Sequence, residues 1–138
     1  MAADATKIFG GAATTIEISA AGADTWSDLG FFRADAEITW EPYAAALSDQ
    51  NEVPLSGLGK IKATLVQSEA ATLTALETYK TAKADLRITD VMSNVHTVTS
   101  IFIKVQVKRA FAPNEPHTVE IMAQRETQNP DDWCAAPS

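Results

Sequence analysis

The sequence lacks several features that mark common protein classes. It has one cysteine, Cys134, in 138 residues, so an internal disulfide is impossible. Such sparse cysteine is typical of a reducing compartment, and we expect the chain to be made and folded in a cytoplasm. No run approaches the roughly 18 apolar residues of a membrane-spanning helix. The first residues also lack the apolar core of a secretory signal. We therefore expect neither membrane insertion nor secretion.

Basic residues are also scarce. Eleven Lys and Arg stand against eighteen Asp and Glu, which gives a formal net charge of −7 and a pI near 4.7. Binding a phosphate backbone requires clustered Lys and Arg, whose contacts release counterions. The two small basic concentrations, at 104–109 and 80–83, are interpreted as solvated faces of a strand and a helix. The composition argues against a nucleic-acid-binding protein, because an acidic surface repels DNA.

No group of residues matches a catalytic or metal-binding pattern. The stretch SGLGK at 56–60 lacks the spacing of a phosphate-binding loop, and a strand rather than a helix is expected to follow it. His96 and His117 both begin expected strands, but no Cys, His or carboxylate spacing completes a metal site around them. Cys134 has no neighbouring base, which a thiol nucleophile needs. We expect no enzyme activity, no cofactor and no metal.

Strand-like alternation of apolar and polar residues is what the sequence does have. It runs through six segments, which are 14–19, 31–40, 60–67, 85–91, 96–109 and 117–124. In the longest segment, the apolar side chains of Ile101, Ile103, Val105 and Val107 share one face. Period-two alternation predicts half-buried antiparallel strands. The expected fold is mainly β: an antiparallel β-sandwich or partly closed barrel with one flanking α-helix.

The one expected helix covers 69–82. Ser68 is a plausible N-cap and Glu69 suits the first turn. A narrow apolar stripe at i, i+3 spacing is formed by Ala70, Leu73, Leu76 and Tyr79. One interpretation is a helix that docks a partner. The other, which we favour because the strands need a cover, is a helix across the open end of the sandwich.

Three irregular segments complete this single domain of residues 1–138. They are an N-terminal arm at 1–12, a long inter-strand loop at 41–58 and a C-terminal arm at 126–138. Long irregular loops in compact domains are usually functional or disordered. The loop residues singled out are Pro42, Tyr43, Leu47, Asp49, Gln50, Asn51, Val53, Pro54 and Leu55. In the terminal arms they are Ile8, Phe9 and Trp133, which pack either on the parent domain or on a neighbour.

The stretch 26–90 resembles the bacteriophage tail tube (major tail) proteins. In that family an Asp-Leu-Gly or Asp-Val-Gly turn, here at 28–30, precedes a strand similar to AEITWEP at 36–42. A long loop follows, and then a strand of the form G-x-x-x-A-T-L, here at 59–65, leads directly into a helix. The expected strands in 96–124 are consistent with the order of elements in the family.

The resemblance implies a structural virion protein. Tail tube proteins are β-sandwiches with one flanking helix that assemble as hexameric rings, and the rings stack into a hollow tube. Residues 41–58 would be the ring-stacking loop, and the terminal arms would add contacts between subunits. DNA passes through such a tube during ejection without specific binding, which suits an acidic protein.

The implied partners are further copies of the chain and other tail proteins: an initiator or baseplate, a terminator and, around a contractile tail, a sheath. The implied location is the virion tail, after assembly in the host cytoplasm. Two alternatives stay open. Another virion protein, such as a tail terminator, connector or decoration protein, would share the architecture. A monomeric small-ligand-binding β-domain would instead use 41–58 as a lid over a concave apolar pocket.

Overall fold

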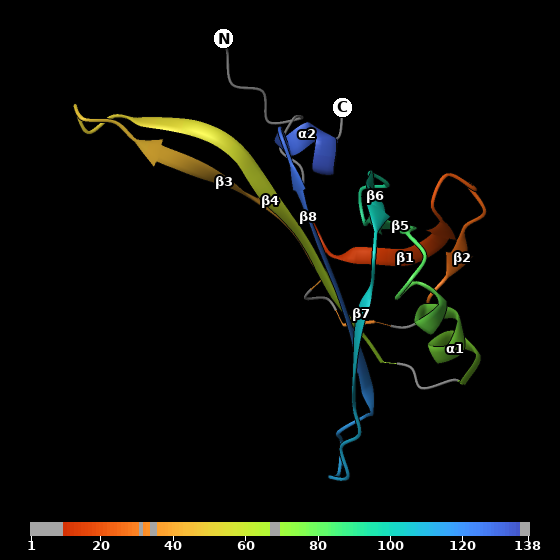
Figure 1. The fold of residues 1–138 in the computed structure, drawn as a ribbon. Helices are drawn as coiled ribbons and strands as arrows, with labels where there is room; N and C mark the ends of the chain where they lie inside the picture. The colour runs from red at the N-terminus through yellow and green to blue at the C-terminus, as the bar shows by residue number, and fades with distance from the viewer. Residues whose placement is uncertain (1–9, 31, 34–35, 67–69, 136–138) are drawn as a thin grey trace.

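The computed structural model describes residues 10–30, 32–33, 36–66 and 70–135. Within these residues it contains eight strands and two short helices (Figure 1). Their order is β1 (Ala13–Ala20), β2 (Ser27–Asp28), β3 (Glu37–Ala46), β4 (Glu52–Leu65), α1 (Ala70–Thr78), β5 (Ala84–Asp90), β6 (Val95–Ile101), β7 (Lys104–Lys108), β8 (Thr118–Thr127) and α2 (Pro130–Trp133).

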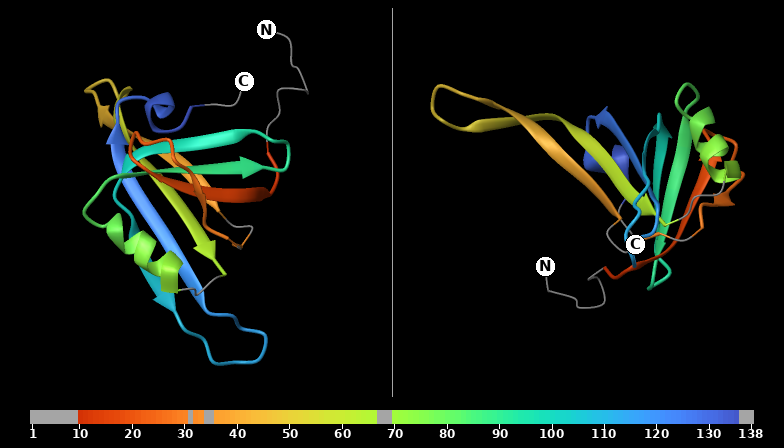
Figure 2. Two further views of the ribbon diagram at one scale, coloured as in Figure 1. Left: turned by 90° about the vertical axis from the view of Figure 1, so that its right-hand side faces the viewer. Right: turned by 90° about the horizontal axis from the view of Figure 1, so that it is seen from below.

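The strands form two antiparallel sheets of four strands each. The short sheet has the order β2-β1-β5-β6, and the long sheet has the order β3-β4-β8-β7. The strands of the two sheets run across one another, and the β3–β4 end of the long sheet projects away from the body (Figure 2). Among the described strands, neither sheet closes into a barrel. The expected antiparallel β-sandwich is thus confirmed, in its open form.

The inward faces of both sheets make one core. Apolar residues of β4 and β8 alternate with outward polar ones, as the period-two pattern predicts. The core residues are Ile16, Ile18, Leu29, Ile61, Ala63, Leu65, Leu76, Ala84, Leu86, Ile88, Val98, Ile101, Ile103, Val119, Ile121, Ala123 and Trp133. Leu76 of α1 and Trp133 of α2 extend this core beyond the sheets. Both helices therefore cover apolar surface that the strands leave open.

Helix α1 is a cover for the sandwich, as favoured from the sequence. Leu76 is fully buried, and Leu73 and Tyr79 pack against the core. The Tyr79 carbonyl accepts a hydrogen bond of 3.0 Å from the Ile103 amide, which ties the end of the helix to the segment between β6 and β7. The helix is shorter than the expected 69–82, and the proposed cap at Ser68 and Glu69 lies outside the described residues.

The expectation of one long strand at 96–109 is wrong. The segment divides into β6 of the short sheet and β7 of the long sheet. Ser100, near the end of β6, is in the left-handed region with φ of 57°, and its amide donates to the Asp85 carboxylate at 3.0 Å. Ile101 and Ile103 are both buried, so the apolar alternation continues through the crossover. Alternation reports which face is buried, but not which sheet a residue joins.

The expectation of an irregular loop at 41–58 is also wrong. Strand β3 begins at Glu37 and continues to Ala46, and β4 begins at Glu52, so only 47–51 form a turn. The expected strand at 31–40 is correspondingly displaced, and its first part contributes one isolated bridge, between Phe32 and Leu65. The extended half of the hairpin shows no alternation in sequence because it packs neither face against the body.

Candidate assembly site

The far half of the β3–β4 hairpin forms an arm, which we define as residues 43–56. Strand β8 pairs with β4 no further than Gly57, whose partner is Thr127. Beyond that pair the arm has two strands, held by the register Ala44 to Pro54 and Ala46 to Glu52. Proline has no amide hydrogen, so Pro54 is tolerated where β4 has lost its second neighbour. The arm is therefore a ribbon with open edges on both sides.

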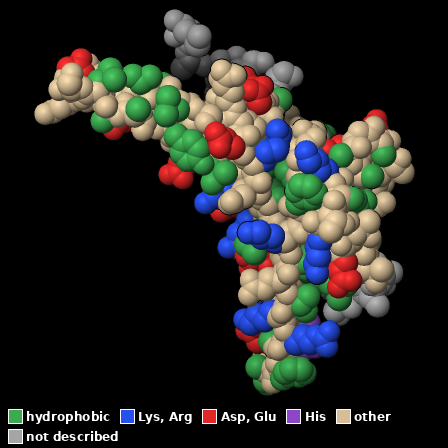
Figure 3. Space-filling view, in the orientation of Figure 1, with side chains coloured by type: hydrophobic (Ala, Val, Ile, Leu, Met, Phe, Trp, Pro, Cys, Tyr) green, Lys and Arg blue, Asp and Glu red, His purple; other side chains and the backbone are tan. Residues whose placement is uncertain are grey.

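Apolar side chains lie exposed along this ribbon. Ala45 pairs with Val53, and Tyr43 and Leu55 lie nearer the base of the arm, where the register shifts between Pro42 and Ala44. Tyr43 is 43% exposed and Leu55 is 53% exposed. Hydrophobic side chains follow the arm in Figure 3. A two-stranded ribbon alone is at best marginally stable in water, and exposed apolar surface of this kind is typical of contacts with another molecule.

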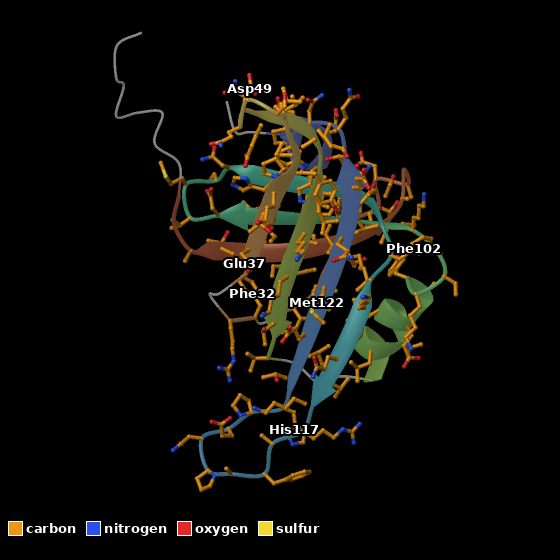
Figure 4. All side chains as sticks on the ribbon, turned by 60° about the vertical axis from the view of Figure 1, so that its left-hand side comes forward. Phe32, Glu37, Asp49, Phe102, His117 and Met122 are labelled. Atoms are coloured by element: carbon orange, nitrogen blue, oxygen red, sulfur yellow. The ribbon has the colours of Figure 1, made fainter. Side chains whose placement is uncertain are left out.

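The polar residues at the tip of the arm build its turn. The Leu47 amide donates to the Asn51 carbonyl at 2.8 Å, and Gln50 takes a left-handed φ of 70°. The Asp49 carboxylate accepts hydrogen bonds from the backbone amide of Asn51 at 3.1 Å and from its side-chain amide at 2.8 Å. These bonds, the backbone one first, hold the pKa of Asp49 below its ordinary value. Asp49 thus stays charged at the outermost point of the arm (Figure 4).

Two tryptophans fix the base of the arm against glycines of β4. A Cβ atom at Gly57 would lie 2.3 Å from Cζ2 of Trp40, and one at Gly59 would lie 2.1 Å from Cδ2 of Trp133. Only glycine leaves room for these close approaches. The Trp40 indole also donates to the Thr127 hydroxyl at 2.9 Å. The direction of the arm is therefore set by the indole rings of Trp40 and Trp133, which pack directly against the backbone of Gly57 and Gly59.

Trp133 packs on its own domain, which decides between the two alternatives for the C-terminal arm. It is 2% exposed, and the Arg125 guanidinium lies 5.7 Å from its ring centroid. It ends α2, where the Asn129 amide donates to the Asp132 carboxylate at 3.2 Å. The described part of this segment, 126–135, is thus no free arm, because β8 continues to Thr127 and a helical turn follows.

The remaining predicted site residues lie as follows. Pro42 sits at the base of the arm, opposite Gly57, on edge strand β3. Ile8 and Phe9 lie outside the described residues. The sequence reasoning missed Trp40, Gly57 and Gly59 as arm-setting residues. The signal that could have found them is a tryptophan in one strand, Trp40, followed in the next strand by two glycines two residues apart, Gly57 and Gly59.

A groove of about 790 Å³ lies on the outward face of the long sheet. Its lining is mixed in chemistry, and includes Glu37, Lys60, Lys62, Lys104, Phe102 and Met122. Figure 4 shows Glu37, Met122 and Phe102 on three different parts of this face. No arm residue contributes to the lining. The interpretation of 41–58 as a lid over an apolar pocket is therefore wrong for this groove.

The groups considered for chemistry have structural partners. The His96 ring lies 3.0 Å from the Asp90 carboxylate, and His117 stands edge-on to Phe111. Burial raises the pKa of the Cys134 thiol, which disfavours the thiolate. In the described part of the chain no three His, Cys, Asp or Glu side chains cluster as metal ligands. Nor does that part hold a helix long and apolar enough to cross a membrane.

Comparison with known proteins places the fold. No protein-family model matches the sequence, and no curated protein sequence matches it either. Among solved structures, the chain is similar to a chain of the tail of an empty GTA particle, described with helical refinement and C6 symmetry. The likeness has a TM-score of 0.57 at 10% identity and covers 93% of this chain and 99% of that chain. The two chains share a fold. The similarity extends over nearly the whole of both chains.

Proposed function

We propose that the chain is a structural subunit of a phage-like tail, and that its copies form hexameric rings that stack into a hollow tail tube. The observation that carries the proposal is the shared fold with a chain of a C6-symmetric tail, over 93% of one chain and 99% of the other. The C6 symmetry of that tail supports a ring of six copies as the expected assembly. On this proposal the chain is not an enzyme and needs no cofactor.

The long sheet offers the edges that a ring requires. Strand β3 lies at one edge and β7 at the other, and each lacks a hydrogen-bonding neighbour on its outer side among the described strands. Exposed edges promote uncontrolled association unless they are paired or blocked. Pairing the β3 edge of one copy with the β7 edge of the next, around a closed ring, would satisfy both edges. We propose this contact as the one between neighbours in a ring.

The outward face of the long sheet would then line the channel. By the register of the strands, its charged residues are the lysines Lys60, Lys62, Lys104 and Lys108 and the glutamates Glu37, Glu41, Glu120 and Glu126. Lys62 and Glu120 lie 3.6 Å apart. Equal numbers of both signs make this face nearly neutral, although the whole chain has a formal net charge of −7. Without a basic cluster, such a lining has no strong hold on a phosphate backbone, so DNA can slide past it.

The arm would supply the contact between rings. Its exposed apolar face is unused within the subunit, and it projects well beyond the body. We propose that it lies on a copy in the adjacent ring. Other tail proteins, such as an initiator at one end and a terminator at the other, would bound the tube, and the assembled particle would be its location.

Negative-stain microscopy with light scattering over a concentration series tests the proposal. We expect hollow tubes from the intact chain, either spontaneously or after addition of sheared tubes as seeds. A matched variant replaces 43–56 with Asn-Gly, which closes a two-residue hairpin between the paired residues Pro42 and Gly57. It should keep the unfolding midpoint of the intact chain and form rings but no tubes.

Three outcomes would contradict the proposal in different ways. Monomers at every concentration, with and without seeds, would overturn it. Rings of the intact chain that never grow would favour a terminator or connector. Unfolding of the shortened variant would show that the arm belongs to the core rather than to an interface.

A further inference from the structure

The arm and the connection between β7 and β8 lie at opposite ends of the long sheet. Strand β4 pairs with β8 from Gly57 opposite Thr127, next to the arm, to Leu65 opposite Val119, next to the connection. This stretch alone spans about 27 Å, at roughly 3.4 Å per residue. Figure 4 places Asp49 at one extremity and His117 towards the other. Within one copy the two ends cannot meet, whereas a second copy displaced along the strands would bring them together.

We propose that the acceptor of the arm is this opposite end of a second copy, formed by 107–117 and called the acceptor loop. The proposal rests on the proposed function, in which the arm joins adjacent rings. It assigns the two halves of that contact to named residues. The occupant of the acceptor loop is therefore a second copy of this chain.

Charge complementarity is the first argument. The arm carries the acidic residues Asp49 and Glu52 and no Lys or Arg. The acceptor loop carries Lys108 and Arg109 against a single Glu115. Figure 3 shows acidic side chains near the tip of the arm and Lys and Arg side chains towards the other end. Opposite charges across an interface steer encounter and suppress wrong pairings, which suits an end-to-end contact.

Exposed apolar surface on both sides is the second argument. Phe111 is 88% exposed, more than the other exposed large apolar residues in the described part of the chain. Val107, at the start of the same loop, is also exposed. The Phe111 ring is braced by His117, with ring centroids 5.4 Å apart. An exposed aromatic ring of this kind matches the exposed face of Tyr43 and Leu55 on the arm. Burying such groups on both partners is what stabilises a specific contact.

The acceptor loop also has a fixed shape. The Glu115 amide donates to the Ala112 carbonyl at 3.2 Å, and Asn114 has a left-handed φ of 65°. Pro113 is the second residue of this turn and Pro116 follows it, and both restrict the backbone further. A preformed loop loses little conformational entropy on binding. Phe111 is thus presented to solvent by a braced turn.

The other exposed apolar patch fits the arm less well. It lies at the turn between β5 and β6 and consists of Val91, Met92 and Val95. The stretch 88–103 contains no Lys or Arg, and its one carboxylate is Asp90. An acidic arm has no opposite charge to meet there. Unlike this patch, the acceptor loop has basic residues next to its exposed apolar side chains.

Reversing the charges tests the pairing. The variant Lys108→Glu/Arg109→Glu should require at least about tenfold more protein to form tubes, because like charges would now face one another. Rings should still form, because the proposed contact between the β3 and β7 edges uses backbone hydrogen bonds rather than the Lys108 side chain. Asp49→Lys/Glu52→Lys should behave in the same way. Combining all four substitutions should restore tubes, since the pairs are re-formed with opposite sign. The matched control is Lys80→Glu/Lys83→Glu, which changes the net charge equally at the end of α1 and should form tubes as the intact chain does.

The outcomes separate this inference from the proposed function. Tubes from the Lys108→Glu/Arg109→Glu variant at the normal concentration would overturn the acceptor assignment while leaving rings and arm intact. If the variant with all four substitutions folds but fails to form tubes, the acceptor assignment is overturned as well. If the charge variants do not fold, Phe111→Ser decides instead, because this exposed side chain does not contribute to the core. Unchanged stacking by Phe111→Ser would then reject the acceptor loop, whereas an intact chain that never forms rings would reject the proposed function with it.

Discussion

Strand β4 is half core and half arm, although its sequence is equally apolar in both halves. From Ile61 to Leu65 its inward side chains are almost completely buried, whereas Val53 and Leu55 are 41% and 53% exposed. The difference comes from what lies opposite the strand. The short sheet covers its second half, Trp133 covers Gly59, and nothing within the described subunit covers the first half. Burial is therefore decided by the neighbours of a strand, and on the proposed function the exposed half would contact another copy.

The largest expected effect compares two leucines of this strand. Leu65→Ala should lower the free energy of unfolding by about 2–5 kcal/mol, because it opens a cavity in the core. Leu55→Ala should change it by no more than about 0.5 kcal/mol. Urea unfolding followed by circular dichroism measures both, and tube formation should show the reverse order among folded variants. Equal destabilisation would mean that the arm packs on its own subunit.

A smaller effect is expected at the boundary between the two halves. Gly59→Ala places a Cβ atom against the Trp133 ring and should cost about 1–3 kcal/mol through overpacking. Tryptophan emission should shift to longer wavelength as the indole is displaced. The control is Gly10→Ala, whose Cβ meets no atom within 4 Å. If Gly59→Ala changes neither the free energy of unfolding nor the tryptophan emission, Trp133 does not fix the base of the arm.

The smallest effect compares two turn carboxylates. Asp90, in the body, accepts hydrogen bonds from the amides of Met92 and Asn94 and lies 3.0 Å from His96 Nε2, and the His96 contact is the main reason that its pKa is lowered. A carboxyl group whose pKa is lowered by folding stabilises the fold at pH values above its unfolded pKa of about 3.9. This stabilisation is lost as the pH falls through the pKa of the folded state.

Asp90→Asn should therefore destabilise the subunit at neutral pH and flatten the acid limb of its stability profile. Asp49→Asn at the exposed arm tip should leave both unchanged, because solvent screens its interactions. Thermal unfolding between pH 3 and pH 7 compares the two variants. If Asp90→Asn loses stability at low pH as the intact chain does, other carboxylates must cause that loss.

The body could be predicted from the sequence and the arm could not, for the same physical reason. Alternation of apolar and polar residues records a strand with one buried face, which holds for β1, β5 and β8. In the arm both faces meet solvent within the subunit, so Ala44 to Ala46 and Val53 to Leu55 carry no such record. The location of the arm was nevertheless apparent as an interruption of the pattern.

Two further features needed three-dimensional information. The change of sheet near Ser100 is invisible because Ile101 and Ile103 continue the alternation into a different sheet. The helical turn α2 had a readable signal in Asn129-Pro130-Asp131-Asp132, which combines a capping residue, a first-turn proline and early acidic residues. That Trp133 would reach back to Gly59 is a long-range contact, which no local pattern reports.

The same contact has a consequence for the timing of synthesis. Strand β4 lies between β3 and β8, and the base of the arm is closed by Trp133. Until residues 118–133 have emerged from the ribosome, β4 has β3 as its only strand neighbour in the long sheet, and the arm has no fixed direction. A chain that stops before these residues thus has an arm whose direction is not fixed by Trp133. On the proposed function, only finished subunits would present the geometry that a growing tube accepts.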